Sequence, residues 1–123
     1  MAQIIITEDY VSLKTARLLK EKGFDVNCIT KYRPDDSIGY WSVEGLNAPT
    51  LQMAMKWLRE VHNIHVELTP ICTGDSEDDL EWHYGWAIKT TIFTDRWTRH
   101  NAEHISYEEA CEAAIKYCLE NLI

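Results

Sequence analysis

The spacing of apolar residues changes from helical to strand-like at Asn63, and this change constrains the fold more than any other sequence feature. Residues 51–62 carry an apolar side chain every three or four positions, which is the spacing of one face of an α-helix. From Ile64 to Thr69 apolar and polar residues alternate, which is the period of a half-buried β-strand. The sequence therefore predicts a fold that combines helices with sheet.

Two further helices are predicted from apolar spacing and from signals at their ends. Ser12 can cap a first helix whose C-terminal stop is Gly23. Ser106 and Glu109 have the spacing of a capping box, S-x-x-E, in front of an apolar stripe that runs to Leu122. Because these signals act within a few residues of each other, they predict where the helices begin and end.

Four strands are predicted, at residues 28–32, 40–43, 64–69 and 82–88. The turn segment RPDDSIG joins the first two into a hairpin, and an acidic loop joins the last two. Gly85 marks a β-bulge or a close neighbour. Residues 3–7 suggest a short edge strand, whereas residues 44–50 and 93–105 are expected to be irregular.

The predicted order is helix, two strands, helix, two strands, helix. Hairpins with separate helices indicate an α+β fold, in which three helices pack on one face of a mostly antiparallel sheet of about four strands. A length of 123 residues is that of one domain, so residues 1–123 are expected to form a single α+β domain.

The net charge of −8, from 20 acidic and 12 basic residues, restricts the partners that the protein can have. A surface of this sign repels phosphate backbones, so we expect no direct contact with nucleic acid. No apolar run approaches the ~20 residues that cross a bilayer, and the opening MAQIIITEDY lacks the basic region of a secretory signal. We therefore expect no membrane association, a cytoplasmic location and reduced cysteines.

Two groups of histidines raise the question of a metal site. His62 and His65 fall at the end of a predicted helix and on the polar face of the next strand, so their rings have no reason to converge. His100, Glu103 and His104 match the inverted zinc-protease order H-x-x-E-H. That motif needs a helix and a third ligand, and this segment precedes the last predicted helix. We expect no metal and no cofactor.

The four cysteines show no metal-binding or catalytic spacing. Cys111 and Cys118 lie seven residues apart on one predicted helix face, roughly 10 Å along the axis, which is too far for a shared metal or a disulfide. They are expected to be small core residues. Cys28 and Cys72 fall near strand ends, and no local signature supports a catalytic pairing of either with a histidine.

The segment GDSEDDLE is the strongest candidate for a binding site. It carries five acidic residues in eight positions, and it lacks the ligand order and central glycine of an EF-hand calcium loop. Carboxylates so close repel one another, and a basic partner would relieve that repulsion. Without a partner, the segment is a solvated hairpin loop. The predicted partner-binding residues are Asp75, Glu77, Asp78, Asp79 and Glu81.

Five tryptophans are many for a chain of this length. Trp57, Trp82 and Trp86 are assigned to core-facing positions of their predicted helix and strand. An aromatic residue left exposed on the sheet would instead indicate a partner surface or a homodimer.

Three blocks cover most of the chain outside its middle: TEDYVSLKTARLLKEKGF, APTLQMAMKWLREVHNIHV and SYEEACEAAIKYCLENLI. They resemble blocks of a family of uncharacterised short proteins of Bacteroides-like gut bacteria and their phages. The resemblance implies a phage or prophage origin, and it supplies no catalytic residues.

Two functions remain in contention. The first is a small non-enzymatic phage or prophage accessory protein that binds an unknown, basic protein. The alternative is an enzyme whose site involves His65, Glu67 and His83 on the polar face of the sheet. A pocket that gathers two of these side chains would favour the enzyme, and a flat polar face would favour the binding protein.

Overall fold

Three helices and two antiparallel sheets make up the described residues, which are 6–40, 44–90 and 97–123 of a computed structural model, with the backbone alone described at 97–103. The helices are α1 (Leu13–Glu21), α2 (Leu51–His62) and α3 (Tyr107–Asn121). The strands are β1 (Thr30–Tyr32), β2 (Ile38–Tyr40), β3 (Leu46–Asn47), β4 (His65–Thr73), β5 (Glu81–Lys89) and β6 (Trp97–His104).

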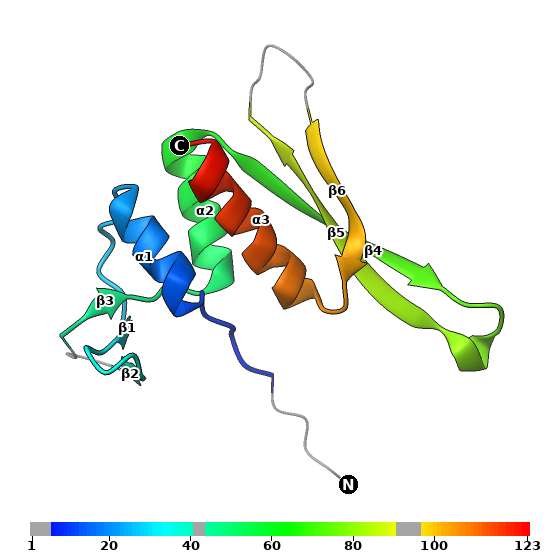
Figure 1. The fold of residues 1–123 in the computed structure, drawn as a ribbon, viewed down its shortest axis with the longest axis horizontal. Helices are drawn as coiled ribbons and strands as arrows, with labels where there is room; N and C mark the ends of the chain where they lie inside the picture. The colour runs from blue at the N-terminus through cyan, green and yellow to red at the C-terminus, as the bar shows by residue number, and fades with distance from the viewer. Residues whose placement is uncertain (1–5, 41–43, 91–96) are drawn as a thin grey trace, which may run out of the picture.

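The architecture is of the predicted α+β class, with the three helices in the predicted order (Figure 1). The described strands number six instead of about four, and they form two sheets in the orders β2-β1-β3 and β4-β5-β6. The two strands that were not predicted are β3, in the expected loop at 44–50, and β6, in the expected irregular segment at 93–105. Both are held by pairing with a neighbouring strand, β3 with β1 and β6 with β5.

Helices α1 and α3 begin at the residues that their sequence signals predict. The Ser12 hydroxyl accepts a hydrogen bond from the Thr15 N–H at 3.2 Å, and the Ser106 hydroxyl accepts one from the Glu109 N–H at 3.0 Å. At the other end of α1, Gly23 has a φ of +97°, a left-handed conformation that ends a helix at little steric cost in glycine. Asn63 ends α2 in the same region of backbone space, as predicted.

Two strand predictions near the N-terminal half fall partly outside the described residues. Of the suggested edge strand at 3–7, only Ile6 and Thr7 are described, and neither belongs to a strand. Of the predicted strand at 40–43, only Tyr40 is described, and it ends β2. The turn between β1 and β2 is the predicted one, with the Arg33 N–H donating to the Ser37 carbonyl at 2.8 Å.

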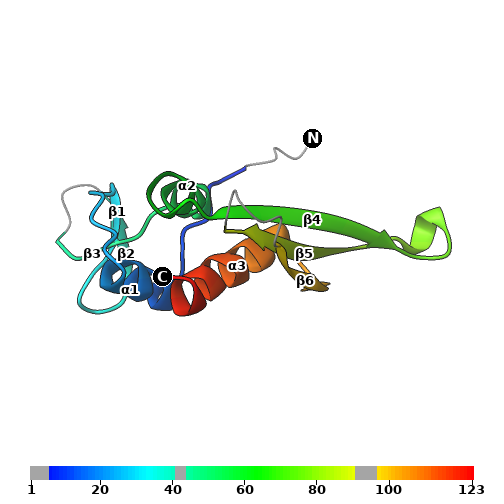
Figure 2. The same ribbon diagram turned by 90° about the horizontal axis from the view of Figure 1, so that it is seen from above.

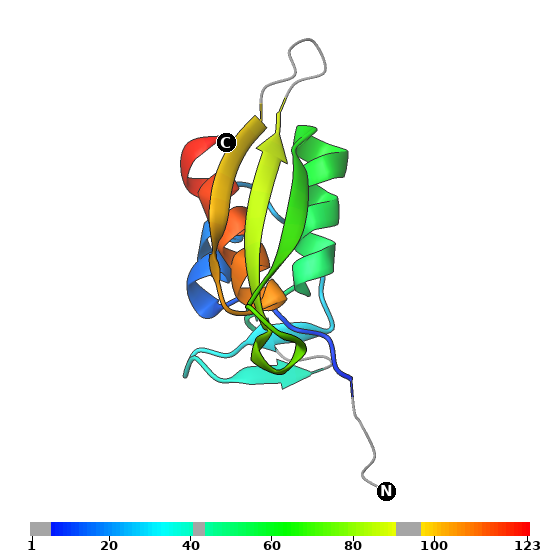
Figure 3. The same ribbon diagram turned by 90° about the vertical axis from the view of Figure 1, so that its right-hand side faces the viewer.

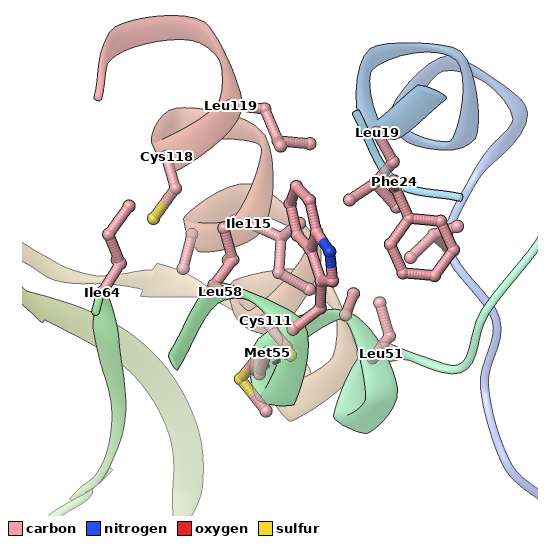
Figure 4. Close-up of a cluster of buried hydrophobic side chains, with 14 of the residues drawn as sticks. Leu19, Phe24, Leu51, Met55, Leu58, Ile64, Cys111, Ile115, Cys118 and Leu119 are labelled. Carbon is pink, nitrogen blue, oxygen red and sulfur yellow. Dashed lines mark hydrogen bonds between the residues drawn. The ribbon is translucent and has the colours of Figure 1, made fainter. Parts of the chain in front are cut away.

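Helix α3 is the centre of the core. It packs on β4 and β5, and α1 and α2 pack on its other sides (Figure 1). Helices α2 and α3 pack on the larger sheet, whereas α1 packs on α3 and on β3 of the smaller sheet, so the prediction that all three helices pack on one sheet is right for two of them (Figure 3). Ten of the buried side chains are labelled in Figure 4: Leu19, Phe24, Leu51, Met55, Leu58, Ile64, Cys111, Ile115, Cys118 and Leu119.

A carboxylate of α3 holds the start of α1. One oxygen of Glu112 accepts hydrogen bonds from the Ser12 N–H, at 3.0 Å, and from the buried Thr15 hydroxyl. Near the end of α1, the Lys22 ammonium donates to the carbonyl of Ile123 at 3.1 Å. These contacts join segments about a hundred residues apart in the sequence.

Candidate functional site

Strands β4 and β5 form a hairpin that extends well beyond the helices (Figures 1 and 2). Its register is continuous over nine residue pairs, the last of which is Thr73 with Glu81. Strand β6 pairs with β5 only as far as Tyr84, so the hairpin is two-stranded beyond that point. We call residues 70–84 the arm.

The base of the arm coincides with the irregularity predicted at Gly85. The register between β5 and β6 shifts between Tyr84 and Trp86. Helix α3 also begins at this level of the sheet. The ring of Tyr107, in the first turn of α3, packs edge-on against the ring of Tyr84, with the ring centroids 6.2 Å apart. The cover that the helices give to the sheet therefore stops where the arm starts.

The tip of the arm is a tight turn that depends on Gly74. This residue has a φ of +141°, and a Cβ at its position would lie 2.2 Å from the carbonyl oxygen of Asp79. A short 3-10 turn, Glu77–Asp79, follows, with the Asp79 N–H donating to the Ser76 carbonyl at 3.0 Å. The turn sets three successive acidic residues on the outermost part of the arm.

All five predicted binding residues lie on or beside this turn, and all are exposed: Asp75, Glu77, Asp78, Asp79 and Glu81. Among the described residues, no lysine or arginine forms an ion pair with any of them. Glu81 lies 3.4 Å from the His83 ring, which carries a charge only when protonated. The tip is thus a cluster of negative charge with almost no compensation from the described side chains.

Apolar side chains are exposed on the same arm. Trp82 is 54% exposed and Leu80 is 52% exposed, and Ile71 is also exposed. The prediction that Trp82 faces the core is wrong, whereas Trp86 on the same face of β5 is buried, as predicted. The physical reason is that the face continues past the start of α3, so this helix does not bury Trp82 as it buries Trp86. An exposed aromatic beside apolar neighbours is typical of a contact surface.

Pro70 makes the free edge of β4 a poor site for an added strand. Within the described sheet, β4 is an edge strand that pairs with β5 alone. Proline has no N–H, and edge prolines are one way in which proteins prevent another chain from extending a sheet. Pro70 therefore weakens strand addition along the β4 edge of the arm.

The residues of the alternative, enzymatic site are not gathered. His65 pairs with Lys89 at the body end of the hairpin, and His83 pairs with Ile71 in the arm. Six residues of strand separate these two positions, or about 20 Å. His65 and Glu67 are exposed on the polar face, and the His65 ring contacts Asn63 at 3.3 Å. His65 and His83 are therefore too far apart to act in one site.

The other histidines also have structural surroundings. His62 ends α2, and its ring packs edge-on against Trp57 at 4.7 Å. His104 lies 3.8 Å from Glu109 of α3. The H-x-x-E-H segment is part of β6, so its backbone is extended and not helical, and the side chains of His100 and Glu103 lie outside the described ones. The expectation of a loop there is wrong, since the segment pairs with β5.

The cysteines divide into three buried thiols and one exposed thiol. Cys111 and Cys118 are fully buried in α3, as predicted, and Figure 4 shows them on successive parts of that helix. Burial raises the pKa of each to about 12, and neighbouring carboxylates add to the effect at Cys111. Burial also raises the pKa of Cys28. Cys72 is exposed on the arm, opposite Trp82.

No group of three metal-binding side chains comes together in the described part of the chain. None of the described helices is long and apolar enough to cross a bilayer. Comparisons with protein-family models, with curated proteins and with solved structures gave no match.

The sequence predicted the carboxylates of the candidate site and missed its apolar part. Leu80 sits among acidic residues, and a single leucine in such a loop carries no pattern that predicts a contact. Trp82 was assigned to the core because it continues the alternation of β5. The available signal was the acidic turn itself, because a strongly charged loop seldom ends a strand that is buried to its last residue.

Proposed function

We propose that this chain is a non-enzymatic accessory protein of phage or prophage origin that works by binding another protein, and that the arm is its binding element. The observation that carries the proposal is the tip: five exposed carboxylates, unpaired with any described lysine or arginine, held on a two-stranded arm with Leu80 and Trp82 exposed beside them. The phage or prophage origin rests on the resemblance of the three sequence blocks.

Charge defines the chemistry of the partner. Carboxylates crowded on one short turn raise each other's energy, and a partner segment rich in lysine or arginine lowers it. The same field attracts such a segment during diffusional encounter, although it is screened over ~8 Å at physiological ionic strength. Phosphate backbones and anionic lipid surfaces have the wrong sign, which supports a basic protein as the partner.

The apolar side chains supply the short-range part of the contact. Tryptophan is over-represented among the residues whose truncation weakens protein interfaces most, because it buries a large rigid surface. Leu80 and Trp82 are two residues apart and directly follow the acidic turn, so a partner that binds the carboxylates lies close to both apolar side chains. The partner is thus a basic segment that also carries an apolar side chain. A cytoplasmic partner is consistent with four cysteines that form no disulfide among themselves.

The test is capture of partners from a lysate of the host bacterium by three forms of the protein. The first is the wild type. The second, the arm-neutral variant, carries Glu77→Gln, Asp78→Asn and Asp79→Asn. The third, the charge-control variant, removes the same number of exposed carboxylates elsewhere, through Glu8→Gln, Glu44→Gln and Glu60→Gln.

We expect the wild type and the charge-control variant to retain the same basic protein, and the arm-neutral variant to lose it. With that protein purified, the association rate should fall by about tenfold in the arm-neutral variant, and rising salt should slow the wild type. His65→Ala should leave both readouts unchanged. Equal capture by all three forms, or a partner that is acidic, would remove the basis of the proposal.

A further inference from the structure

A basic hollow lies at α1, at the opposite end of the molecule from the tip of the arm (Figures 1 and 2). Its volume is about 390 Å³. Three cationic residues line it, Arg17, Lys20 and Arg33, together with one acidic residue, Asp36. The guanidinium of Arg33 lies against Gly39 of β2. The apolar part of the lining comes from Leu13, Tyr32, Pro34 and Leu46.

The positive charge of this hollow is only partly compensated. Arg17 lies 3.4 Å from Asp36, in an ion pair whose two side chains are both well exposed, so it contributes little to stability. Lys20 and Arg33 form no ion pair within 4 Å of a described carboxylate. Hydrogen bonds from Ser37 and, to a smaller extent, the charge of Arg33 lower the pKa of Asp35, so Arg33 has a carboxylate nearby that does not line the hollow. The lining therefore keeps a net charge of +2.

Two further cations lie close together between α1 and α3. Lys116 of α3, as a hydrogen-bond partner and as a like charge, lowers the pKa of the Lys14 ammonium on α1. Glu120 lies 3.8 Å from Lys116 and opposes this effect, so this lysine pair is already partly compensated. The charge argument therefore rests on the residues that line the hollow.

We propose that the tip of the arm of one copy occupies the basic hollow of a second copy. This inference rests on the proposed function, because both require the arm to be a binding element. It adds a specific surface to which the arm can bind. The tip combines carboxylates with Leu80, and the hollow combines cations with an apolar lining. The two surfaces match in both charge and polarity.

The positions of the two surfaces define the assembly. Because they lie at opposite ends of the molecule, two copies placed side by side and antiparallel can make the contact twice, each arm on the other copy's hollow (Figure 2). Such a pair is closed by a two-fold axis, the commonest symmetry of soluble oligomers. The net charge of −8 on each copy opposes association. At physiological ionic strength, charges interact mainly over distances of ~8 Å. The charges that close in the proposed contact are those of the tip and of the hollow, which are opposite in sign.

The first experiment is sedimentation of the purified protein alone over a wide range of concentration. We expect a shift from one chain to two as concentration rises, and a shift back to one chain in high salt. The arm-neutral variant should stay monomeric under conditions in which the charge-control variant pairs. A wild type that remains monomeric throughout overturns the inference.

A charge exchange tests which surfaces meet. The arm-reversed variant carries Glu77→Lys, Asp78→Lys and Asp79→Lys, and the hollow-reversed variant carries Arg17→Glu, Lys20→Glu and Arg33→Glu. Each alone should be monomeric, because its tip and hollow have the same sign. Mixed in equal amounts, they should form a pair containing one copy of each, since both contacts again join opposite charges.

The outcome separates this inference from the proposed function. If both reversed variants melt cooperatively and their mixture stays monomeric, the arm does not enter the hollow, while capture of a foreign basic protein can still succeed. If the mixture pairs and the wild type captures no other protein, self-association stands and the proposed function fails. Pairing that survives either reversal alone also overturns the inference, because another surface would then be responsible.

Discussion

Two thiols in the centre of the core predict a specific loss of stability at alkaline pH. Cys111 and Cys118 are fully buried, and burial raises the pKa of each from its ordinary value of 9.0 to about 12. In the unfolded chain both thiols are in water and release their protons near the ordinary value. The unfolded state therefore ionises first as the pH rises. The contribution of the buried neutral thiols to the free energy of unfolding is fully present below pH 9 and is lost progressively towards pH 12.

The size of the effect follows from the pKa difference. For each pH unit inside this window, the free energy of unfolding falls by about 1.36 kcal/mol per thiol. Between pH 8 and pH 10, each thiol thus lowers the free energy of unfolding by about 1.4 kcal/mol, and the two together by about 3 kcal/mol. Since a domain is stable by roughly 5–15 kcal/mol in total, this loss is large enough to measure. Cys28 acts in the same direction, because burial raises its pKa too.

The assay is urea unfolding of the wild type and of Cys118→Ala, each at pH 8 and at pH 10. The substitution lowers stability at both pH values through the cavity it leaves, so only the difference between the two pH values is compared. Lysine and tyrosine titrations are common to both proteins and cancel in that comparison. The pH-dependent loss should be smaller in Cys118→Ala by about 1.4 kcal/mol. If both proteins lose the same amount, the Cys118 thiol ionises in the folded state and its burial in α3 is wrong.

Three further outcomes are expected from the same geometry. Ser106→Ala removes the cap of α3 and should lower the free energy of unfolding by about 1 kcal/mol in a urea titration. Cys118→Ser buries a hydroxyl and should lower it by about 1–3 kcal/mol. A Cys118→Ser variant as stable as the wild type would contradict the packing of that side chain. Gly74→Ala strains the tip of the arm and should abolish self-association while the thermal melt of the core changes little; normal pairing would show that the tip is not needed. A thiol reagent should label Cys72 rapidly in the folded protein and Cys111 only after unfolding, as mass spectrometry of peptides can check, and rapid labelling of both would contradict their exposures.

The helices were predictable because their signals are local. Ser12 and Ser106 each cap a helix through a backbone N–H three residues ahead, and Gly23 and Asn63 end helices through their own backbone conformation. Interactions over so few residues depend little on the rest of the fold. The α+β class follows from them, together with the alternation in β4 and β5.

The missed strands carry no pattern of their own. β3 is two residues long and exists because Leu46 and Asn47 pair with β1. β6 has the sequence WTRHNAEH, which is polar at most positions on both faces, and its extended form comes from pairing with β5. Pairing with another strand is not encoded in the periodicity of the segment itself, so periodicity could not predict either strand.

The candidate site was half predictable for a similar reason. The alternation that buries Trp86 continues unchanged to Trp82, and the exposure of Trp82 depends only on where α3 begins. The cations of the hollow also come from separate segments, since Arg17 lies on α1 and Arg33 follows β1. A sequence shows charges and their spacing, but it does not show which of them the fold gathers.

The central position of α3 has a consequence for biosynthesis. Chains are made from the N-terminus, and α3 is the last of the described elements to leave the ribosome. Until then α1 has no Glu112 to hold its first turn, and the apolar faces of α1 and α2 have no partner helix. The nascent chain must therefore carry exposed apolar surface until α3 has emerged, and its core can form only then. A ribosome that stalls before α3 would yield a fragment prone to aggregation and to proteolysis.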